Sequence, residues 1–428
     1  MIDTGKEKEK VFLVAAAARD HVEEAYGLLD ELERLAETAE AAVAGRMVQL
    51  LPHPDPGTYL GKGKAEEAGK LARSLGADVI LADDELTPGQ MYGLEQASGM
   101  PVIDRTMVIL DIFARHAGTR ESMIQVELAE LEYASSRLTG HGKMLSRQGG
   151  GIGTRGPGEK KLEQDRRLIR KRIAVLRREL ADVEAHRKEM RSRRERAGMH
   201  HAAIVGYTNA GKSTLLNRLT GSGVLAENKL FATLDTSTRM FVLPEGEKML
   251  LTDTVGFIRK LPHHLIKAFR STLEEARYAD VLIHVVDASS PEREEEMQTV
   301  YETLDRLELG ARRVLTLFNK MDAAADGEIL HDRRADETLR ISAVEGTGLD
   351  QIPLRLQKLF REDRVPVEGL FSYREMELLQ MLRSEGEMIL EDYRDNGIYV
   401  KAMADRHTAG RVIKMHGETA GREDTMRA

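Results

Sequence analysis

The run from Ala202 to Thr220, AAIVGYTNAGKSTLLNRLT, decides the fold. It starts with four apolar residues typical of a buried strand, passes through GYTNAGKS (Gly206 to Ser213) and continues into a helix-like segment. A phosphate-binding loop requires this strand–loop–helix context. In such a loop backbone N–H groups surround the phosphates, Lys212 places a positive charge on the β- and γ-phosphates, and the Ser213 hydroxyl is a ligand of Mg²⁺. The run therefore predicts an α/β domain that binds a nucleotide.

Three later segments follow in the order expected of a guanine-nucleotide site. Asp253-Thr254-Val255-Gly256 follows an apolar strand, so that its aspartate suits a contact to Mg²⁺ and the Gly256 N–H can meet the γ-phosphate. Asn319-Lys320-Met321-Asp322 follows the apolar strand expected at Val314–Phe318. The Asp322 carboxylate can accept from N1–H and N2–H₂ of guanine together, which adenine cannot supply. Ser342-Ala343-Val344 then stands where a loop would back the base, and the base is predicted to be guanine.

A switch segment is expected between the first two of these motifs, in FATLDTSTR from Phe231 to Arg239. Such a segment must supply a threonine to Mg²⁺ and the γ-phosphate, so that loss of the phosphate releases the loop. Thr233, Thr236 and Thr238 are all chemically eligible, and their spacing does not choose between them.

Composition sets the class of protein. The 428 residues predict about three domains at roughly 150 residues each. There is no cysteine, which excludes disulfides, zinc fingers and thiol nucleophiles and leads us to expect a cytoplasmic protein. No apolar run is long enough for a membrane-spanning helix. The net charge is −8, yet residues 141–200 hold 18 Lys and Arg against 8 Asp and Glu. A basic segment in an acidic protein indicates a localised anionic partner.

We expect an α/β protein with four parts. Residues 1–116 alternate short strands with amphipathic helices, which predicts an open α/β domain with strands near 11–14, 46–51, 78–81 and 102–103. Residues 117–199 predict an antiparallel helical hairpin, residues 200–361 a P-loop domain with a mostly parallel central sheet, and residues 362–428 a small α+β unit. In that last unit Asn396-Gly397 favours a tight β-hairpin.

The helical hairpin is predicted from two apolar stripes at heptad spacing, within 119–138 and 159–197. The connection between them is glycine-rich and basic, and we expect it to be a loop from 139 to 161. Two interpretations stay open, a flexible linker or a tip that contacts RNA phosphates without reading sequence. The predicted RNA contacts are Lys143, Arg147, Arg155, Lys160 and Lys161.

Three motifs together resemble the HflX family of translational GTPases: FATLD at Phe231, GGGIGTRGPGE at Gly149 and YLGKGK at Tyr59. The resemblance covers most of the chain and weakens after about residue 360. It implies a factor that binds and hydrolyses GTP, associates with the large ribosomal subunit and splits or rescues ribosomes. It also implies that Thr233 is the switch ligand of Mg²⁺ and that the basic tip reaches ribosomal RNA. Thr236 stands where the family pattern has a proline. We expect a monomer.

These motifs give the predicted site. The GTP contacts are Gly206, Tyr207, Thr208, Asn209, Ala210, Gly211, Lys212, Ser213, Phe231, Ala232, Thr233, Leu234, Asp235, Asp253, Thr254, Val255, Gly256, Asn319, Lys320, Met321, Asp322, Ser342, Ala343 and Val344, with Ser213 and Thr233 as Mg²⁺ ligands.

The catalytic group is unassigned. Phe257 occupies the place where Ras-like enzymes have a glutamine that orients the attacking water, and a phenyl ring cannot do so. Asn209 either holds a K⁺ ion, as in potassium-activated relatives, or only stabilises its loop. Two functions follow, a GTP-hydrolysing ribosome factor or a GTP-dependent RNA-binding module with negligible hydrolysis of its own.

Overall fold

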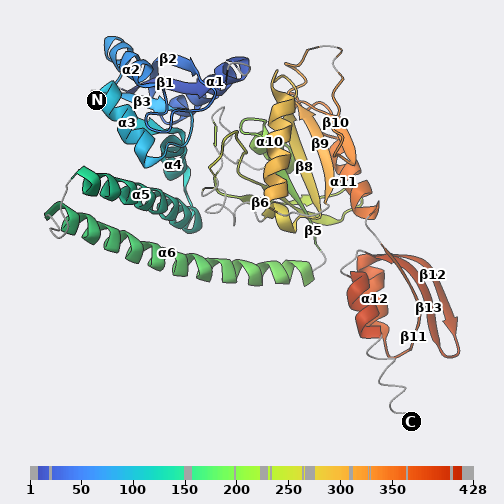
Figure 1. Cartoon of the computed structure of the whole chain (residues 1–428). Helices are drawn as coiled ribbons and strands as arrows, with labels where there is room; N and C mark the ends of the chain where they lie inside the picture. The colour runs from blue at the N-terminus through green and yellow to red at the C-terminus, as the bar shows by residue number, and fades with distance from the viewer. Residues whose placement is uncertain are drawn as a thin grey trace, which may run out of the picture.

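The computed structural model describes residues 8–18, 22–148, 157–196, 199–221, 230–231, 234–262, 265, 275–307, 312–325, 327, 329–362, 365–404 and 408–416. Figure 1 shows two α/β sheets side by side, a long helical hairpin along one side of both, and a small unit beyond the second sheet. No described helix is long and apolar enough to cross a membrane.

The first sheet is parallel, with the strand order β2-β1-β3-β4. One of its two central strands, β1, is buried from Val11 to Ala15, which explains the continuous apolar run of that strand. Leu29, Leu32 and Leu35 of the first helix lie in the same apolar cluster as this sheet at 0% exposure, and their spacing is that of one face of a helix. The four predicted strands are confirmed. The elements are β1 (Lys10–Ala17), α1 (Val22–Thr38), β2 (Ala42–Leu50), α2 (Lys62–Ser74), β3 (Val79–Ala82), α3 (Pro88–Ser98), β4 (Val102–Asp104) and α4 (Arg105–His116).

The hairpin consists of α5 (Arg120–Gln148) and α6 (Pro157–Arg196). Ile124 and Leu128 of α5 enclose Leu176 of α6, so the two apolar stripes face each other. The predicted loop from 139 to 161 is wrong over most of its length, because α5 continues to Gln148 and α6 begins at Pro157. Gly140 and Gly142 each lower helix propensity by about 1 kcal/mol relative to alanine, and α5 nevertheless continues through both.

The second sheet has the order β10-β9-β8-β5-β7-β6, and only β6 is antiparallel to its neighbour. Apolar side chains cover both of its faces. One of these clusters is shared with the N-terminal domain, since it contains both Phe113 of α4 and Phe257. The elements are β5 (His200–Gly206), α7 (Lys212–Thr220), β6 (Ser237–Val242), β7 (Lys248–Asp253), β8 (Val281–Asp287), α10 (Arg293–Arg306), β9 (Arg313–Asn319), β10 (Glu337–Arg340) and α11 (Gln351–Glu362).

The last unit is an antiparallel sheet in the order β11-β13-β12, covered by α12 (Met376–Glu385). Its strands are β11 (Val365–Phe371), β12 (Gly386–Arg394) and β13 (Gly397–Ala404). The hairpin turn is Asp395-Asn396, one residue earlier than the sequence suggested. Gly397 opens β13 with φ 149°, and a side chain there would come within 2.4 Å of the Phe371 carbonyl oxygen.

Candidate nucleotide-binding site

The predicted phosphate loop connects β5 to α7, as the sequence required. Gly211 precedes the helix at φ 98°, and a Cβ there would lie 2.3 Å from Nδ2 of Asn319. Asn209 also has a left-handed backbone, at φ 60°. These conformations turn the loop around the N-terminus of α7, whose free N–H groups and dipole favour an anion.

Lys212, the predicted phosphate-binding lysine, is buried beneath this loop. Its Nζ donates to the carbonyl oxygens of Gly206 at 3.1 Å and Tyr207 at 2.7 Å. Burial lowers the pKa of Lys212 to about 8, although the nearby Asp253 carboxylate opposes the shift. The ammonium group is therefore held in position without a full counter-charge, which a phosphate group can provide.

Ser213 and Asp253, the predicted Mg²⁺ contacts of the loop and of β7, meet directly. The Ser213 hydroxyl donates to Oδ2 of Asp253 at 2.6 Å. Asp253 is fully buried, burial raises the pKa of its carboxyl group, and its Oδ1 has no hydrogen-bond partner among the described residues. A buried carboxylate oxygen left unpaired beside a serine hydroxyl is a donor set suited to a hard cation such as Mg²⁺.

Gly256 closes the other side of the predicted phosphate site. A Cβ at this position would lie 2.8 Å from Cγ2 of Thr208 and 3.0 Å from Nζ of Lys212. Only glycine therefore lets the backbone pass this close to the lysine. The preceding residues hold the strand end in place, since Thr254 Oγ1 donates to the Ile204 carbonyl at 2.7 Å and Val255 is buried.

The segments predicted to bind the base are joined to the phosphate loop through Asn319. Its side-chain amide donates to the Ala210 carbonyl at 2.8 Å and accepts from the Ala343 N–H at 2.9 Å. Ser342 Oγ donates to Oδ1 of Asp322 at 2.6 Å, which orients the predicted guanine-reading carboxylate. Lys320, at φ 62°, places its Nζ 2.6 Å from Asp287.

Two of the residues predicted to contact the base, Met321 and Val344, lie at the edge of the site. Met321 is half-buried against the cluster around Phe318, and Val344 is 62% exposed. The structure thus brings the predicted residues of four segments to one end of the parallel sheet, where ligands of open α/β sheets bind.

The switch segment is described only in part. Ala232 and Thr233 lie outside the described residues. Phe231 and Leu234 are buried, and the Phe231 ring contacts Phe113 of α4 edge-on at 4.8 Å. Asp235, predicted as a GTP contact, instead accepts from the backbone N–H of Gly118 at 2.8 Å. Phe231 and Asp235 therefore contact residues that precede the hairpin helix α5 in the chain.

Phe257 is the residue at the expected water-orienting position. It is 1% exposed and belongs to the shared apolar cluster. Its N–H donates to the Gly206 carbonyl at 3.1 Å and its own carbonyl accepts from the Thr208 N–H at 2.8 Å. The ring is thus a packing element, and it supplies no group that could activate water.

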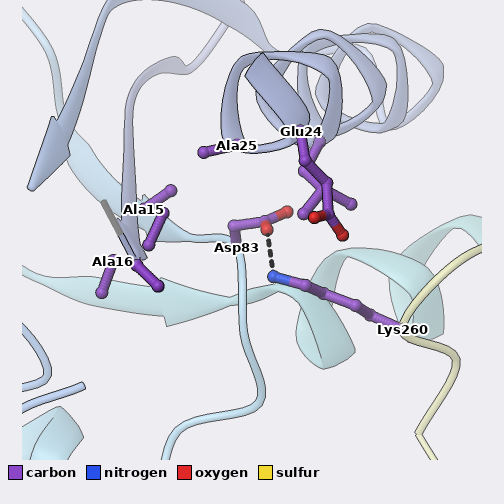
Figure 2. A pocket seen from close by; sticks show the side chains of 9 residues that line it. Ala15, Ala16, Glu24, Ala25, Asp83 and Lys260 are labelled. Carbon is purple, nitrogen blue, oxygen red and sulfur yellow. Dashed lines mark hydrogen bonds and ion pairs between the residues drawn. The ribbon is translucent and has the colours of Figure 1, made fainter. Parts of the chain in front are cut away.

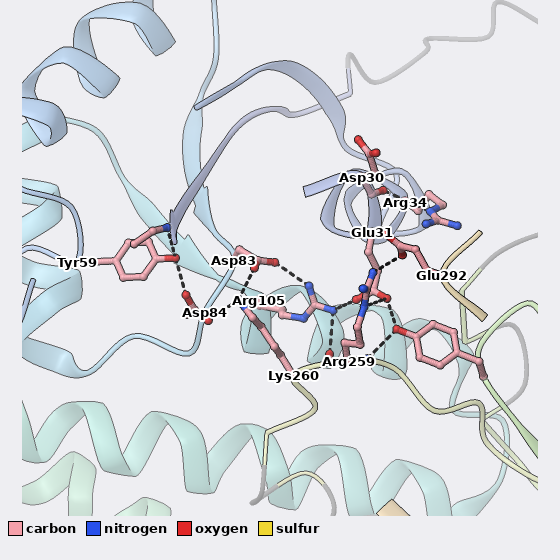
Figure 3. Close-up of polar contacts among 12 residues, drawn as sticks. Asp30, Glu31, Arg34, Tyr59, Asp83, Asp84, Arg105, Arg259, Lys260 and Glu292 are labelled. Carbon is pink, nitrogen blue, oxygen red and sulfur yellow. Dashed lines mark hydrogen bonds and ion pairs between the residues drawn. The ribbon is translucent and has the colours of Figure 1, made fainter. Parts of the chain in front are cut away.

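A cluster of charged groups joins the N-terminal domain to the residues after Phe257 (Figure 3). Arg105 of α4 donates to Asp83 at 2.8 Å, to Glu31 of α1 and to the Arg259 carbonyl at 3.0 Å. Lys260 lies 2.6 Å from Asp83. We call the set of Glu31, Asp83, Asp84, Arg105, Tyr207, Arg259, Lys260 and Glu292 the interdomain cluster.

The interdomain cluster also contacts the phosphate loop itself. The Tyr207 hydroxyl donates to Glu31 and accepts from the Arg259 N–H at 2.8 Å. Burial raises the pKa of Tyr207, and the Glu31 carboxylate raises it further. Sequence reasoning missed this cluster, because Glu31 and Arg105 are 74 residues apart and neither belongs to a motif.

Lys260 and Asp83 also line a cavity of about 280 Å³ at the carboxyl end of β1 (Figure 2). The glycine-rich turn at Gly61 presents backbone N–H groups, which in such a turn can bind an anion. Its Gly61 N–H donates to Gln49 Oε1 at 2.8 Å, and Lys64 pairs with Glu67 at 2.9 Å. With these groups engaged, the structure favours a tight turn that starts α2.

The predicted RNA contacts lie far along the hairpin. Lys143 and Arg147 belong to the last turns of α5, and Lys160 and Lys161 to the first turn of α6. Arg155 lies outside the described residues. Both helices thus bring basic residues to the end of the hairpin that is remote from the nucleotide site (Figure 1).

Three family models match consecutive regions of the chain. Residues 27–114 match the model described as GTP-binding GTPase N-terminal, and residues 116–194 match GTP-binding GTPase Middle Region. Residues 201–320 match 50S ribosome-binding GTPase.

Curated relatives extend over nearly the whole chain. A GTPase HflX of Lacrimispora saccharolytica is 54% identical over 94% of this chain and 95% of its own length. A GTPase HflX of Caldanaerobacter subterraneus subsp. tengcongensis is 46% identical over 94% and 92%, respectively. A solved structure described as SsGBP and GDP complex aligns at 25% identity over 82% of this chain and 98% of that chain, with a TM-score of 0.45, too low to add to the assignment. On the strength of the curated relatives and the family models, the chain belongs to the HflX family of GTPases and is a GTP-hydrolysing enzyme.

Proposed function

We propose that this GTPase associates with the large ribosomal subunit and splits or rescues ribosomes under the control of a GTP switch. The observation that carries the proposal is the basic segment 141–200, with 18 Lys and Arg against 8 Asp and Glu, in a hairpin beside a GTPase domain. Lysine and arginine neutralise phosphates without sequence readout, as a structured RNA surface requires. The family description 50S ribosome-binding GTPase, matched at residues 201–320, supports the same partner.

In this proposal the phosphates lie on the loop 206–213, with Lys212 against the β- and γ-phosphates. Mg²⁺ would be held by Ser213 and, in the GTP state, by Thr233, with Asp253 beside it. Oδ1 of Asp253, which has no hydrogen-bond partner in the described part of the chain, supports this placement. The bound metal would neutralise charge that develops on the phosphates during hydrolysis. Asp322 reads guanine, and the Ser342 hydroxyl orients its carboxylate by donating to Oδ1.

Intrinsic hydrolysis is expected to be slow, because Phe257 is buried and cannot orient water. A partner that completes the site would then set the rate, which fits stimulation by ribosomes. The same observation favours the second candidate, a GTP-dependent RNA-binding module whose unaided turnover is negligible. Turnover measured with and without large subunits separates the two, since only the first predicts stimulation. K⁺ beside Asn209 is a further proposal, tested by exchanging K⁺ for Na⁺ in the same assay.

Sedimentation with ribosomal subunits tests the partner directly. We expect the protein to pellet with large subunits in the presence of a GTP analogue and less with GDP. Replacing Lys143, Arg147 and Arg155 with serine should weaken this association and lower the slope of log K against log salt by about one unit or slightly less per lost phosphate contact.

A matched control removes three positive charges elsewhere. Lys248, Arg374 and Lys414 are exposed, and none of them belongs to α5 or α6. Their replacement with serine should leave the affinity and the salt slope near the parental values. If the Lys143, Arg147 and Arg155 variant keeps the parental ribosome affinity and salt slope, the end of the hairpin only connects the two helices and does not contact RNA.

A further inference from the structure

The switch segment is fastened to the first residues of the hairpin through Asp235. Its carboxylate accepts three hydrogen bonds, from the Gly118 N–H at 2.8 Å, the Thr119 N–H at 3.1 Å and the Thr119 hydroxyl at 2.6 Å. Gly118 and Thr119 directly precede α5. Thr119 also caps that helix, since its Oγ1 accepts from the Ser122 N–H at 3.2 Å. One carboxylate of the GTPase domain therefore binds the N-terminal end of the long hairpin helix.

The other end of the same segment lies at the phosphate loop. Leu230 lines a cavity of about 230 Å³ together with Thr208 and Asn209. Phe231 then contacts Phe113, and its backbone is left-handed at φ 56°, which a bulky side chain adopts only under constraint. Four residues, 231–234, thus separate Leu230 beside the phosphate loop from Asp235 at the hairpin, and Thr233 is one of them in the chain.

We propose that Asp235 is a positioning residue that couples the Mg²⁺-binding switch to the orientation of the hairpin. The inference rests on the proposed function for Thr233 and the hairpin. Fastening both ends of a short segment reduces the conformational freedom that must be lost when its threonine reaches the metal. The Asp235–Thr119 contact therefore favours the GTP state over the GDP state, in which no γ-phosphate engages the switch.

Thermodynamic reciprocity means that the Asp235–Thr119 contact would couple the nucleotide site to the hairpin. If the Asp235–Thr119 contact strengthens GTP binding, then GTP strengthens the contact by the same factor. Nucleotide state would then change how firmly α5 is held against the GTPase domain. A second contact acts in parallel, because Arg187 of α6 lies 3.5 Å from Oγ1 of Thr236 and forms an ion pair with Glu121 at 3.2 Å.

A contact that only stabilised the fold would behave differently. Thr119 already caps the N-terminus of α5. The helix therefore does not require Asp235 to satisfy its first free backbone N–H groups. Loss of a purely structural contact would weaken GTP and GDP binding equally. The ratio of the two affinities is therefore the quantity that separates the interpretations.

The test is a double-mutant cycle on the full chain, with Asp235→Ala, Thr119→Val and both together. Equilibrium binding of a non-hydrolysable GTP analogue and of GDP is measured for each variant. We expect each single change to weaken the analogue at least about five-fold more than GDP, the lower end of typical allosteric coupling. The double variant should lose little more than Asp235→Ala alone, because Asp235→Ala already removes the hydrogen bond that Thr119→Val removes. Thr119→Ser keeps the hydroxyl and should bind both nucleotides as the parent does.

Three results would overturn the inference: equal weakening of both nucleotides, fully additive losses, or a parental affinity ratio in Thr119→Val. If Asp235→Ala fails to fold, Thr119→Val alone decides. It removes both the donor to Asp235 and the cap of α5, but loss of the cap would weaken the two nucleotides equally and leave their affinity ratio unchanged. The binding arm uses no ribosomes, so it stands apart from the proposed partner. If the unmodified protein does not sediment with large subunits, the proposed function is wrong. The ratio of GTP-analogue to GDP affinity would still test the role of Asp235.

Discussion

Burial and nucleotide binding shift the pKa of the Lys212 ammonium group in opposite directions. Burial lowers its pKa to about 8 from a usual 10.5. Between these two values the unfolded chain holds a proton that the nucleotide-free folded protein lacks, so stability should rise with pH across that window. A phosphate placed beside Lys212 favours the charged form and raises the pKa again. Nucleotide binding is therefore expected to take up a proton.

That uptake is measurable by titration calorimetry of GDP at pH 8 in buffers of different ionisation enthalpy. With a pKa of about 8, about half of the protein molecules should gain a proton at Lys212 on binding. Lys212→Arg keeps the charge at all these pH values and should show no uptake from this position. Identical binding enthalpies in every buffer for the parent would contradict the lowered pKa.

A second prediction at this scale concerns the base. Asp322→Asn replaces an acceptor with an amide that presents a donor, so GTP should weaken by roughly 1–3 kcal/mol and xanthosine triphosphate should be preferred. Competition binding of the two nucleotides provides the measurement. The control is Asp350→Asn, because Asp350 is exposed and its loss removes the same charge. If Asp322→Asn binds GTP as tightly as the parent, another residue reads the base.

At the scale of elements, the hairpin owes its geometry to a narrow apolar seam. Leu176 of α6 is completely buried between Ile124 and Leu128 of α5, while Leu168 on the same helix is 64% exposed. The seam is reinforced by ion pairs such as Arg172 with Glu127 at 2.6 Å, but both of these side chains are largely exposed and such pairs add little.

Leu176→Ala should therefore destabilise the hairpin by about 2–5 kcal/mol, the usual range for a buried leucine. Leu168→Ala in the same helix should change it by less than about 0.5 kcal/mol. Hydrogen exchange of the α5 and α6 amides is the suitable measurement, because a chain of several domains need not unfold in one step. Equal loss of protection in both variants would mean that the seam does not hold the two helices together.

At the scale of the whole molecule, the interdomain cluster holds the N-terminal domain against the GTPase domain. Each side keeps an ion pair of its own, Arg105 with Asp83 at 2.8 Å on one and Arg259 with Glu292 at 2.6 Å on the other. Separation of the domains would thus leave neither arginine without a partner. Burial alone would lower the pKa of Arg105, but Glu31 and Asp83 outweigh it and raise the pKa.

Arg105→Gln would leave Glu31 and Asp83 buried with less positive charge beside them. We expect a loss of about 3–5 kcal/mol in stability, as for other buried pairs that lose one partner. Arg115→Gln is the control, because Arg115 is 42% exposed and its pairs with Glu40 and Asp111 should contribute less than about 1 kcal/mol. Denaturant unfolding followed by N-terminal and GTPase-domain probes measures both. A loss in Arg105→Gln no larger than that in the control would show that Arg105 is dispensable.

Local patterns were sufficient for much of this protein. Apolar runs predicted the four strands of the first sheet and the strands of the second sheet that precede the nucleotide-binding motifs. The order of four short motifs predicted which residues meet at the nucleotide site. Such features depend on neighbours within a few positions, where side-chain type and backbone geometry are directly linked. The family followed from motifs for the same reason, and the curated relatives confirm it.

Only the packed chain decided the rest. The Arg105–Glu31 and Asp235–Thr119 contacts join residues 74 and 116 positions apart, and no sequence periodicity predicts them. The extension of α5 to Gln148 was missed because its glycines favour a loop locally. The burial of Phe257 depends on a core that the two domains share. Contacts of this kind depend on which surfaces meet after the domains form, and a linear sequence does not encode that in any local pattern.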